Sequence, residues 1–248
     1  MLLLLAALVL SAGPTRESLQ AQEHLKEGQS LMATERFEAA AQQFREAIRF
    51  DPLLMMAHYG LGQSQMALKQ FPSAVTAFQG ARKAFHDAAA EGLTRKLENQ
   101  NARETRIRDL QDAIRDNAAR TLPAGSRAER VREQRITQWE MEIAMLQRSR
   151  NVATSQETPA GLSLALGSAH FRSAQMAEAE REYRAALAVN SKLAEARNNL
   201  AVVLLLTGRP GDAKEQLRLA EKNGFKVATG LKEDVEVALA TGSNSPHP

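Results

Sequence analysis

Small and hydrophobic residues recur along the chain with a period of 34 residues. Gly28 and Gly62 are one period apart, and so are Phe44 and Phe78. The same separation relates further pairs in two regions: Ala40 and Ala74, Ala47 and Ala81, Leu166 and Leu200, Ala179 and Ala213, and Ala186 and Ala220. A fixed period of this length is typical of repeat architectures. The pattern predicts four repeated units, at 21–54, 55–88, 160–193 and 194–227.

Each unit has the features of two antiparallel helices. We expect small residues such as Gly28 and Ala40 where the two helices touch most closely, and large residues such as Leu31 and Phe44 between neighbouring units. Pro52 is expected to end the second helix of the first unit. One such hairpin cannot bury its own apolar face, so stacked copies forming a helical solenoid are predicted.

This pattern resembles the tetratricopeptide repeat (TPR) family, whose motif runs W-x2-L-G-x2-Y, then A, F, A and P. The matching residues are Gly28, Leu31, Ala40, Phe44, Ala47 and Pro52 in the first unit; Leu61, Gly62, Ala74, Phe78 and Ala81 in the second; Leu166, Gly167, Ala179, Tyr183 and Ala186 in the third; and Leu200, Ala201, Gly208, Ala213, Leu217 and Ala220 in the fourth. The Trp position departs from the motif in every unit and holds His24, His58, Ser163 and Arg197. Only the first unit keeps the final proline.

The resemblance implies a non-catalytic scaffold that binds a partner protein or peptide in a concave groove lined by the first helix of each unit. The family's ligand positions give a candidate partner groove of Leu25, Gln29, Met32, Met56, Tyr59, Gln63, Met66, Leu164, Phe171, Arg172, Asn198, Val202 and Leu205. The basic cluster with which some TPR adaptors hold a C-terminal carboxylate is missing, and Arg172 is isolated. We therefore expect an apolar or helical ligand segment, with the alternative that a helix of the same chain fills the groove.

Residues 89–159 do not continue the motif. Leu122–Gly125 is a break, and Ser126 with Glu129 is typical of the start of a new helix. The seam Ile136, Trp139, Ile143 and Leu146 has coiled-coil spacing. The segment is predicted as an inserted hairpin of helices at about 88–121 and 126–150; the alternative is two degenerate repeats. We expect the seam to pack within the hairpin, with weak self-association through Trp139 as the alternative.

The two ends of the chain differ from the repeats. Leu2 to Leu10 are all apolar and precede Ser11–Gly13, which resembles a secretory signal peptide in residues 1–13, followed by the N-terminal region 14–88. This predicts a periplasmic or extracellular location; the alternative is a mis-chosen start codon or a short buried helix, with a cytoplasmic protein. At the other end, 228–240 is predicted as a capping helix and 241–248 as a disordered tail.

Composition and charge reduce the number of fold and function classes that fit this chain. Aromatic residues are only 4% of the chain, which favours an all-α fold. There is no cysteine and the five histidines have no metal-ligand spacing, so we expect no metal, no cofactor and no enzyme activity. The net charge of +3 is a small surplus. Arginines of the insert alternate with acids, which favours solvated helices; binding of nucleic acid or an anionic surface through the insert is the alternative function.

Overall fold

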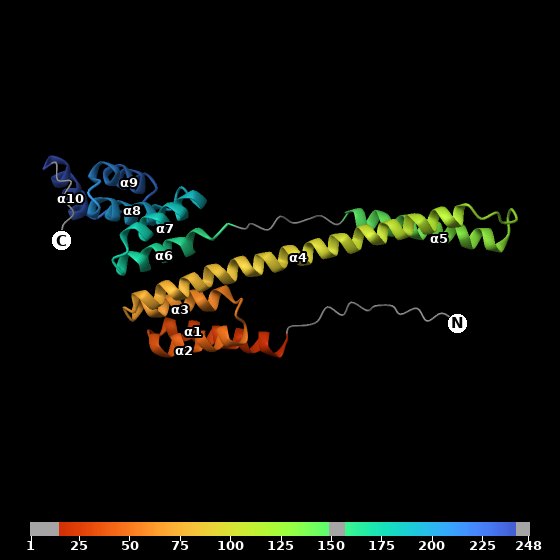
Figure 1. Ribbon diagram of the computed structural model, residues 1–248, viewed down its shortest axis with the longest axis horizontal. Coiled ribbons are helices and arrows are strands. Elements are labelled where there is room, and N and C mark those ends of the chain that lie inside the picture. The colour runs from red at the N-terminus through yellow and green to blue at the C-terminus, as the bar shows by residue number, and fades with distance from the viewer. Residues whose placement is uncertain (1–14, 149–156, 242–248) are drawn as a thin grey trace. The chain divides into compact units, whose positions relative to one another are not determined.

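The computed structural model describes residues 15–148 and 157–241, and these residues form ten helices and no strand (Figure 1). The helices are α1 (Arg16–Ala33), α2 (Phe37–Phe50), α3 (Met55–Ala67), α4 (Phe71–Ala118), α5 (Arg127–Arg148), α6 (Ala160–Arg172), α7 (Met176–Val189), α8 (Ala194–Leu206), α9 (Pro210–Lys222) and α10 (Thr229–Ala240). The predicted all-α fold is confirmed. No helix among the described residues is long and apolar enough to cross a membrane. The expected signal peptide at 1–13 lies outside the described residues.

The chain forms two compact units. The first contains the described residues up to Asp87 and from Glu157 onward, and the second contains those from Ala88 to Arg148. Helix α4 belongs to both units, because it runs without interruption from Phe71 to Ala118. We had expected a helix to start near residue 88, and the structure has no helix boundary there. The expected start came from the repeat length, and no proline interrupts the sequence between Ala81 and Ala118.

The repeats of the first unit are helical hairpins that stack in order. Helices α1 and α2 pair, as do α6 and α7 and also α8 and α9, and α2 and α7 each contact the helix that follows. The insertion does not interrupt the stack. Val75 and Phe78 of α4 share one buried cluster with Leu162 and Leu166 of α6. The second and third repeats therefore pack directly against each other, although the whole second unit separates them in sequence.

An ion pair also joins the second and third repeats. The guanidinium of Arg82 on α4 lies 2.8 Å from Oε1 of Glu182 on α7. The Glu182 side chain is only 7% exposed, so this carboxylate depends on Arg82 for its charge partner. His86 Nε2 and Thr158 Oγ1 form a hydrogen bond of 3.0 Å nearby, where the chain leaves the first unit and where it returns.

The turn between the two helices of a repeat has the same backbone form in all four copies. Glu35, Lys69 and Ala174 have φ values of 57°, 59° and 59°, and Gly208 has 76°. Each occupies the fifteenth position of its repeat. Left-handed backbone at this place is normally taken by glycine, yet only the fourth repeat has one.

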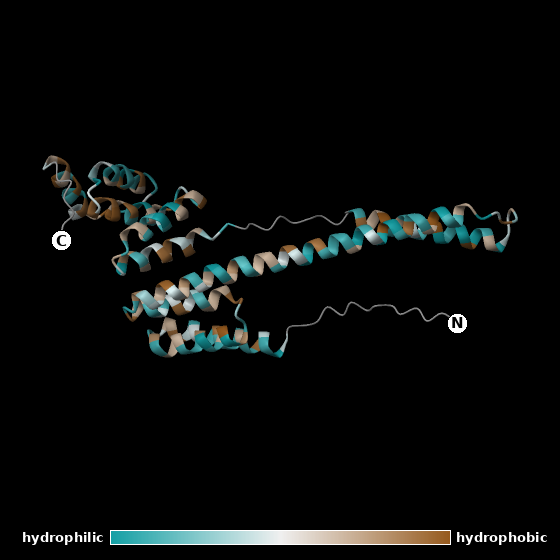
Figure 2. Ribbon diagram, viewed as in Figure 1, coloured by the Kyte–Doolittle hydropathy of each residue, from teal (hydrophilic) through white to brown (hydrophobic). Residues whose placement is uncertain are grey.

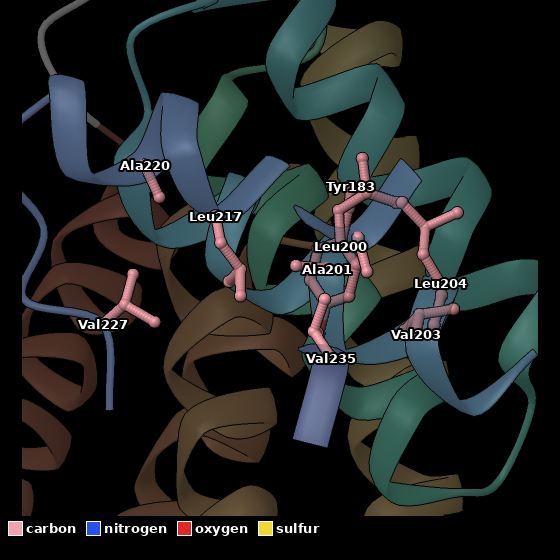
Figure 3. Close-up of a cluster of buried hydrophobic side chains, with 11 residues drawn as sticks. Tyr183, Leu200, Ala201, Val203, Leu204, Leu217, Ala220, Val227 and Val235 are labelled. Carbon is pink, nitrogen blue, oxygen red and sulfur yellow. The ribbon is translucent and has the colours of Figure 1, made fainter. Parts of the chain in front are cut away.

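The C-terminal end of the stack is closed by α10, as predicted for a capping helix. Val235 of α10 is 1% exposed and joins a cluster that includes Tyr183, Leu200, Leu204 and Leu217 (Figure 3). Helix α10 contacts both α8 and α9. It therefore covers apolar surface that a further repeat would otherwise cover.

The second unit is a helical hairpin in which hydrophilic residues are interspersed with hydrophobic ones (Figure 2). Helix α5 begins as predicted, because the Glu129 N–H donates to Ser126 Oγ at 3.1 Å. Leu110 of α4 is buried, while Trp139 and Ile143 of α5 are half-buried. The Arg106 guanidinium donates to Glu142 across the hairpin at 2.8 Å. Self-association through Trp139 remains a prediction.

Candidate partner-binding face

The predicted groove residues lie on four helices, α1, α3, α6 and α8, which are the first helices of the four repeats. Helix α1 contacts α3, and α6 contacts α8. Tyr59 and Met66 of α3 pack against the cluster that contains Leu166 of α6, so the row continues across the insertion. The four helices are therefore neighbours in one row.

A pocket of about 270 Å³ opens where three of these repeats meet. Its lining residues come from α3, α6, α7 and α8: Met66, Ser168, Phe171, Arg172, Tyr183, Asn199 and Val202. Met66, Phe171, Arg172 and Val202 are among the predicted groove residues. The pocket can exist only because the second and third repeats are in contact, which brings Met66 to the same surface as Phe171.

Besides Ser168, two lining residues are absent from the predicted groove. Tyr183 was assigned to the core because Phe44, Phe78 and Leu217 occupy its position in the other repeats. Its ring is indeed buried, but its hydroxyl donates to Ser168 Oγ at 3.4 Å and so reaches the pocket. A polar group at an otherwise apolar repeat position was the available signal.

Asn199 is the second unexpected residue. The repeat alignment placed its neighbour Asn198 in the groove, whereas the pocket is lined by Asn199. The Asn198 amide donates to Asn199 Oδ1 at 3.4 Å. The two amides therefore stand side by side, and the sequence position alone could not tell which one faces the pocket.

The other predicted groove residues lie outside this pocket. Leu25 is 7% exposed and belongs to the N-terminal core cluster, so its position is structural. Leu164 and Leu205 are half-buried against the C-terminal cluster. The remaining members are half-buried or exposed side chains of the same helices: Gln29, Met32, Met56, Tyr59, Gln63 and Asn198.

Among the predicted groove residues, only Arg172 carries a charge. The Arg172 guanidinium lies 4.7 Å from the centroid of the Phe71 ring and forms no ion pair with the described residues. Burial raises the pKa of Tyr59, and the negative charge of Glu195 raises it further. Burial likewise raises the pKa of Tyr183. Both phenols therefore remain hydrogen-bond donors at neutral pH.

The described residues contain no cluster of three or more His, Asp or Glu side chains that could hold a metal ion. The side chains that line the pocket offer apolar contact, hydroxyl and amide groups for hydrogen bonding, and the Arg172 guanidinium. An apolar surface with a few convergent amide and hydroxyl groups suits the binding of a side chain with its adjoining backbone.

Arginines of the second unit are engaged with acids. Arg106 pairs with Glu142 at 2.8 Å, and Arg115 pairs with Asp112 at 2.7 Å. These pairs place both signs of charge on the same helices. A surface for nucleic acid would carry one sign, so the geometry does not favour the alternative function.

Comparison with known proteins gives a family match and several similar folds. The family model described as tetratricopeptide repeat matches residues 25–91 and 164–224, slightly more than half of the chain. No curated protein sequence matches significantly. Among solved structures, the MamA protein is 13% identical, with a TM-score of 0.48 over 89% of this chain and 88% of that one.

Two further structures are similar in the same way. PilW, a type IV pilus biogenesis factor, is 14% identical with a TM-score of 0.43 over 90% of this chain and 88% of that one. A thermophilic TPR protein of Thermus thermophilus is 20% identical with a TM-score of 0.35 over 89% of this chain and 99% of that one. These similarities concern the fold.

Proposed function

The chain belongs to the tetratricopeptide repeat family, and we propose that it is a non-catalytic scaffold that binds a segment of a partner protein on the face made by α1, α3, α6 and α8. The observation that carries this proposal is the pocket of about 270 Å³ shared by three repeats. A surface on which several repeats converge offers more contact than any one hairpin.

The ligand that suits the pocket is a segment with an apolar anchor side chain. Met66, Phe171 and Val202 provide an apolar wall, and methionine adapts to different apolar shapes. Ser168 and Asn199 stand beside this wall and can bond to the backbone of the bound segment. The absence of a basic cluster among these lining residues makes apolar contact the main source of affinity.

A peptide selection tests the proposal. Peptides of random sequence are selected on the immobilised full chain, and the affinity of the best peptide is measured for the wild type and for Met66→Ala. We expect about tenfold weaker binding, the equivalent of about 1.4 kcal/mol of lost apolar contact. Met145→Ala is the matched control, because Met145 is 77% exposed and lies on α5, outside the pocket.

The same peptide distinguishes apolar from electrostatic binding. Affinity for an apolar anchor should change little with salt, since screening acts on charges. If Met66→Ala leaves the affinity unchanged while Arg172→Ala abolishes it, the apolar anchor is wrong and an ionic contact with Arg172 replaces it.

We also propose that the protein is exported. The apolar run from Leu2 to Leu10 supports this, although it lies outside the described residues. Intact-mass measurement of the native protein should find a chain that starts near Gly13. A cytoplasmic protein that retains the residues of the apolar run would contradict export.

A further inference from the structure

Helix α5 of the second unit carries two stripes of residues that differ in exposure. The first is half-buried and includes the seam residues Ile136, Trp139, Ile143 and Leu146. The second, which we name the outer stripe, consists of Val131, Gln134, Gln138, Met141 and Met145. Each outer-stripe residue stands two positions after a half-buried one, which is a rotation of about 200° around the helix. The outer stripe therefore faces away from the seam.

The outer stripe is exposed and uncharged. Val131, Met141 and Met145 are 45%, 61% and 77% exposed, and the two glutamines between them are exposed as well. None of the five residues carries a charge. Charged residues do occur at other exposed positions of the same stretch, namely Glu133, Arg135 and Glu140. A helix face that stays in water is normally charged or strongly polar, so the composition of this stripe is that of a contact surface.

The other helix of the hairpin lacks such a stripe. On α4 the half-buried or buried residues are Ile107, Leu110 and Ile114, and the positions two residues further along hold Asp109, Asp112 and Asp116. All three aspartates are exposed. The outward face of α4 is thus acidic at the level where the outward face of α5 is uncharged. Only the α5 side of the hairpin has the composition of a contact surface.

The outer stripe is complementary to itself in the antiparallel direction. Its residues alternate in spacing between three and four, which lets two helices pack along their length. Val131 lies seven positions before Gln138, and Met145 lies seven positions after it. A two-fold axis through Gln138 would therefore place Val131 opposite Met145 of a second copy, at both ends of the contact. Gln134 would meet Met141 of the second copy in the same way. An interface of two identical patches is the commonest one in symmetric dimers.

Charges at the edge of the stripe fit the same axis. Arg135 lies three positions before Gln138 and Glu142 lies four after it, so the axis brings Arg135 level with Glu142 of the second copy. Arg135 is exposed and forms no ion pair with the described residues. Glu142 accepts from Arg106 through Oε1 at 2.8 Å, and a carboxylate has a second oxygen that can accept from Arg135. A parallel arrangement would not bring these two residues to the same level.

We propose that the protein forms a dimer in which the outer stripe of α5 packs antiparallel against the outer stripe of a second copy. Three observations agree on this arrangement: the exposed uncharged stripe, its symmetry about Gln138, and the opposite charges of Arg135 and Glu142. The contact differs from self-association through Trp139, which lies in the seam. It involves the second unit alone, and it does not rest on the partner-binding face.

Disulfide trapping tests the register, because the native chain has no cysteine. Gln138→Cys lies on the axis and should form a cross-linked dimer with copper phenanthroline as the oxidant. Glu140→Cys is the matched control, exposed but off the stripe, and should react about tenfold more slowly, since its sulfurs do not meet. Val131→Cys and Met145→Cys should each fail to cross-link alone, because each cysteine lies about 21 Å along the helix from its own copy. Mixed together, the two variants should cross-link to each other.

Sedimentation velocity of the full chain measures the strength of the dimer without a cross-link. Met145→Glu places a charge at both ends of the contact and should weaken dimerisation about tenfold or more. Gln147→Glu is the matched control, because it adds the same charge to the same helix at an exposed position off the stripe; it should leave the dimer unchanged. Circular dichroism verifies that both variants are equally helical.

The proposal is overturned if the wild type is monomeric at concentrations up to about 0.1 mM, or if Gln138→Cys and Glu140→Cys cross-link at the same rate. Cross-linking of Val131→Cys with itself would show a parallel pairing and would also overturn it. A dimer that survives Met145→Glu but is lost on Trp139→Ala would place the contact on the seam instead. The peptide selected on the partner-binding face should bind Met145→Glu as tightly as the wild type, so the two proposals fail or succeed separately.

Discussion

A Cβ atom on Gly62 would lie 2.5 Å from the ring of Phe78, which is closer than any stable side-chain contact. Phe78 is fully buried, and its ring occupies the space where the side chain of residue 62 would be. The fourth repeat has Ala201 and Leu217 at the same two positions. In the fourth repeat, leucine replaces phenylalanine on the second helix, and alanine replaces glycine on the first helix. The smaller side chain on one helix thus leaves room for the larger one on the other.

This relationship predicts that Gly62→Ala destabilises the protein by about 2 kcal/mol, because the added methyl overpacks the core. Adding Phe78→Leu to the same chain should restore part of the loss, since it recreates the pair of the fourth repeat. The measurement is urea unfolding followed by circular dichroism. Gly92→Ala is the control: its Cβ would meet nothing within 4 Å, so this change should stabilise α4 by up to about 1 kcal/mol.

A second prediction concerns the turn between α6 and α7, which contains Ala174. Ala174 has a φ of 59°, a conformation that costs a non-glycine residue about 1 kcal/mol. Ala174→Gly should therefore raise the free energy of unfolding by about 0.5 kcal/mol after the added entropy of the unfolded chain is subtracted. Ala185→Gly, at an exposed site within α7, should lower it by about 1 kcal/mol. Equal effects of both changes would contradict the role of the turn.

A third prediction concerns the ion pair of Arg82 and Glu182, which joins the second and third repeats. Arg82→Met removes the charge partner of the Glu182 carboxylate, which stays buried, and should cost about 3 kcal/mol. Adding Glu182→Met should recover part of this loss, because no charge then remains to be buried. A double-mutant cycle by chemical unfolding measures the coupling. Independent, additive effects would mean that the two side chains do not interact in solution.

The junction of the third and fourth repeats makes stability depend on pH. Arg209, which directly precedes α9 in the fourth repeat, donates to Oε1 of Glu180 on α7 of the third repeat at 2.9 Å. This hydrogen bond holds the pKa of Glu180 below its ordinary value of 4.5. A carboxyl whose pKa is lowered by folding contributes stability above the unfolded pKa and loses it as pH falls through the folded pKa.

Wild type should therefore be more stable than Glu180→Gln at neutral pH, by about 1 kcal/mol. The difference should shrink as the pH falls below the ordinary pKa of 4.5, and it should be nearly absent at about pH 2. Thermal unfolding of both proteins across this range is the measurement. Glu46→Gln, which removes an exposed pair with Arg49, should have a smaller effect at every pH. A difference that does not vary with pH would exclude this contribution.

The repeat period predicted most of the first unit, because contacts within a hairpin recur at fixed positions in every copy. It could not predict the contact of Phe78 with α6, which joins residues on either side of the insertion. It also misplaced the start of the long helix, since a repeat length marks where a motif ends and not where a helix stops. The pocket was predicted in part: Met66 and Phe171 follow from repeat position, whereas the hydroxyl of Tyr183 is peculiar to one copy.

The hydrogen bond between His86 and Thr158 joins residues that are 72 positions apart in the chain. Closing a flexible loop of that length costs roughly 4 kcal/mol of chain entropy. A helical hairpin that forms first shortens the flexible part of this loop, so the second unit acts on the folding rate of the first. We expect the two pairs of repeats to fold locally and to join last. A substitution of Leu110 that loosens the hairpin would then delay this joining, although Leu110 belongs to neither pair.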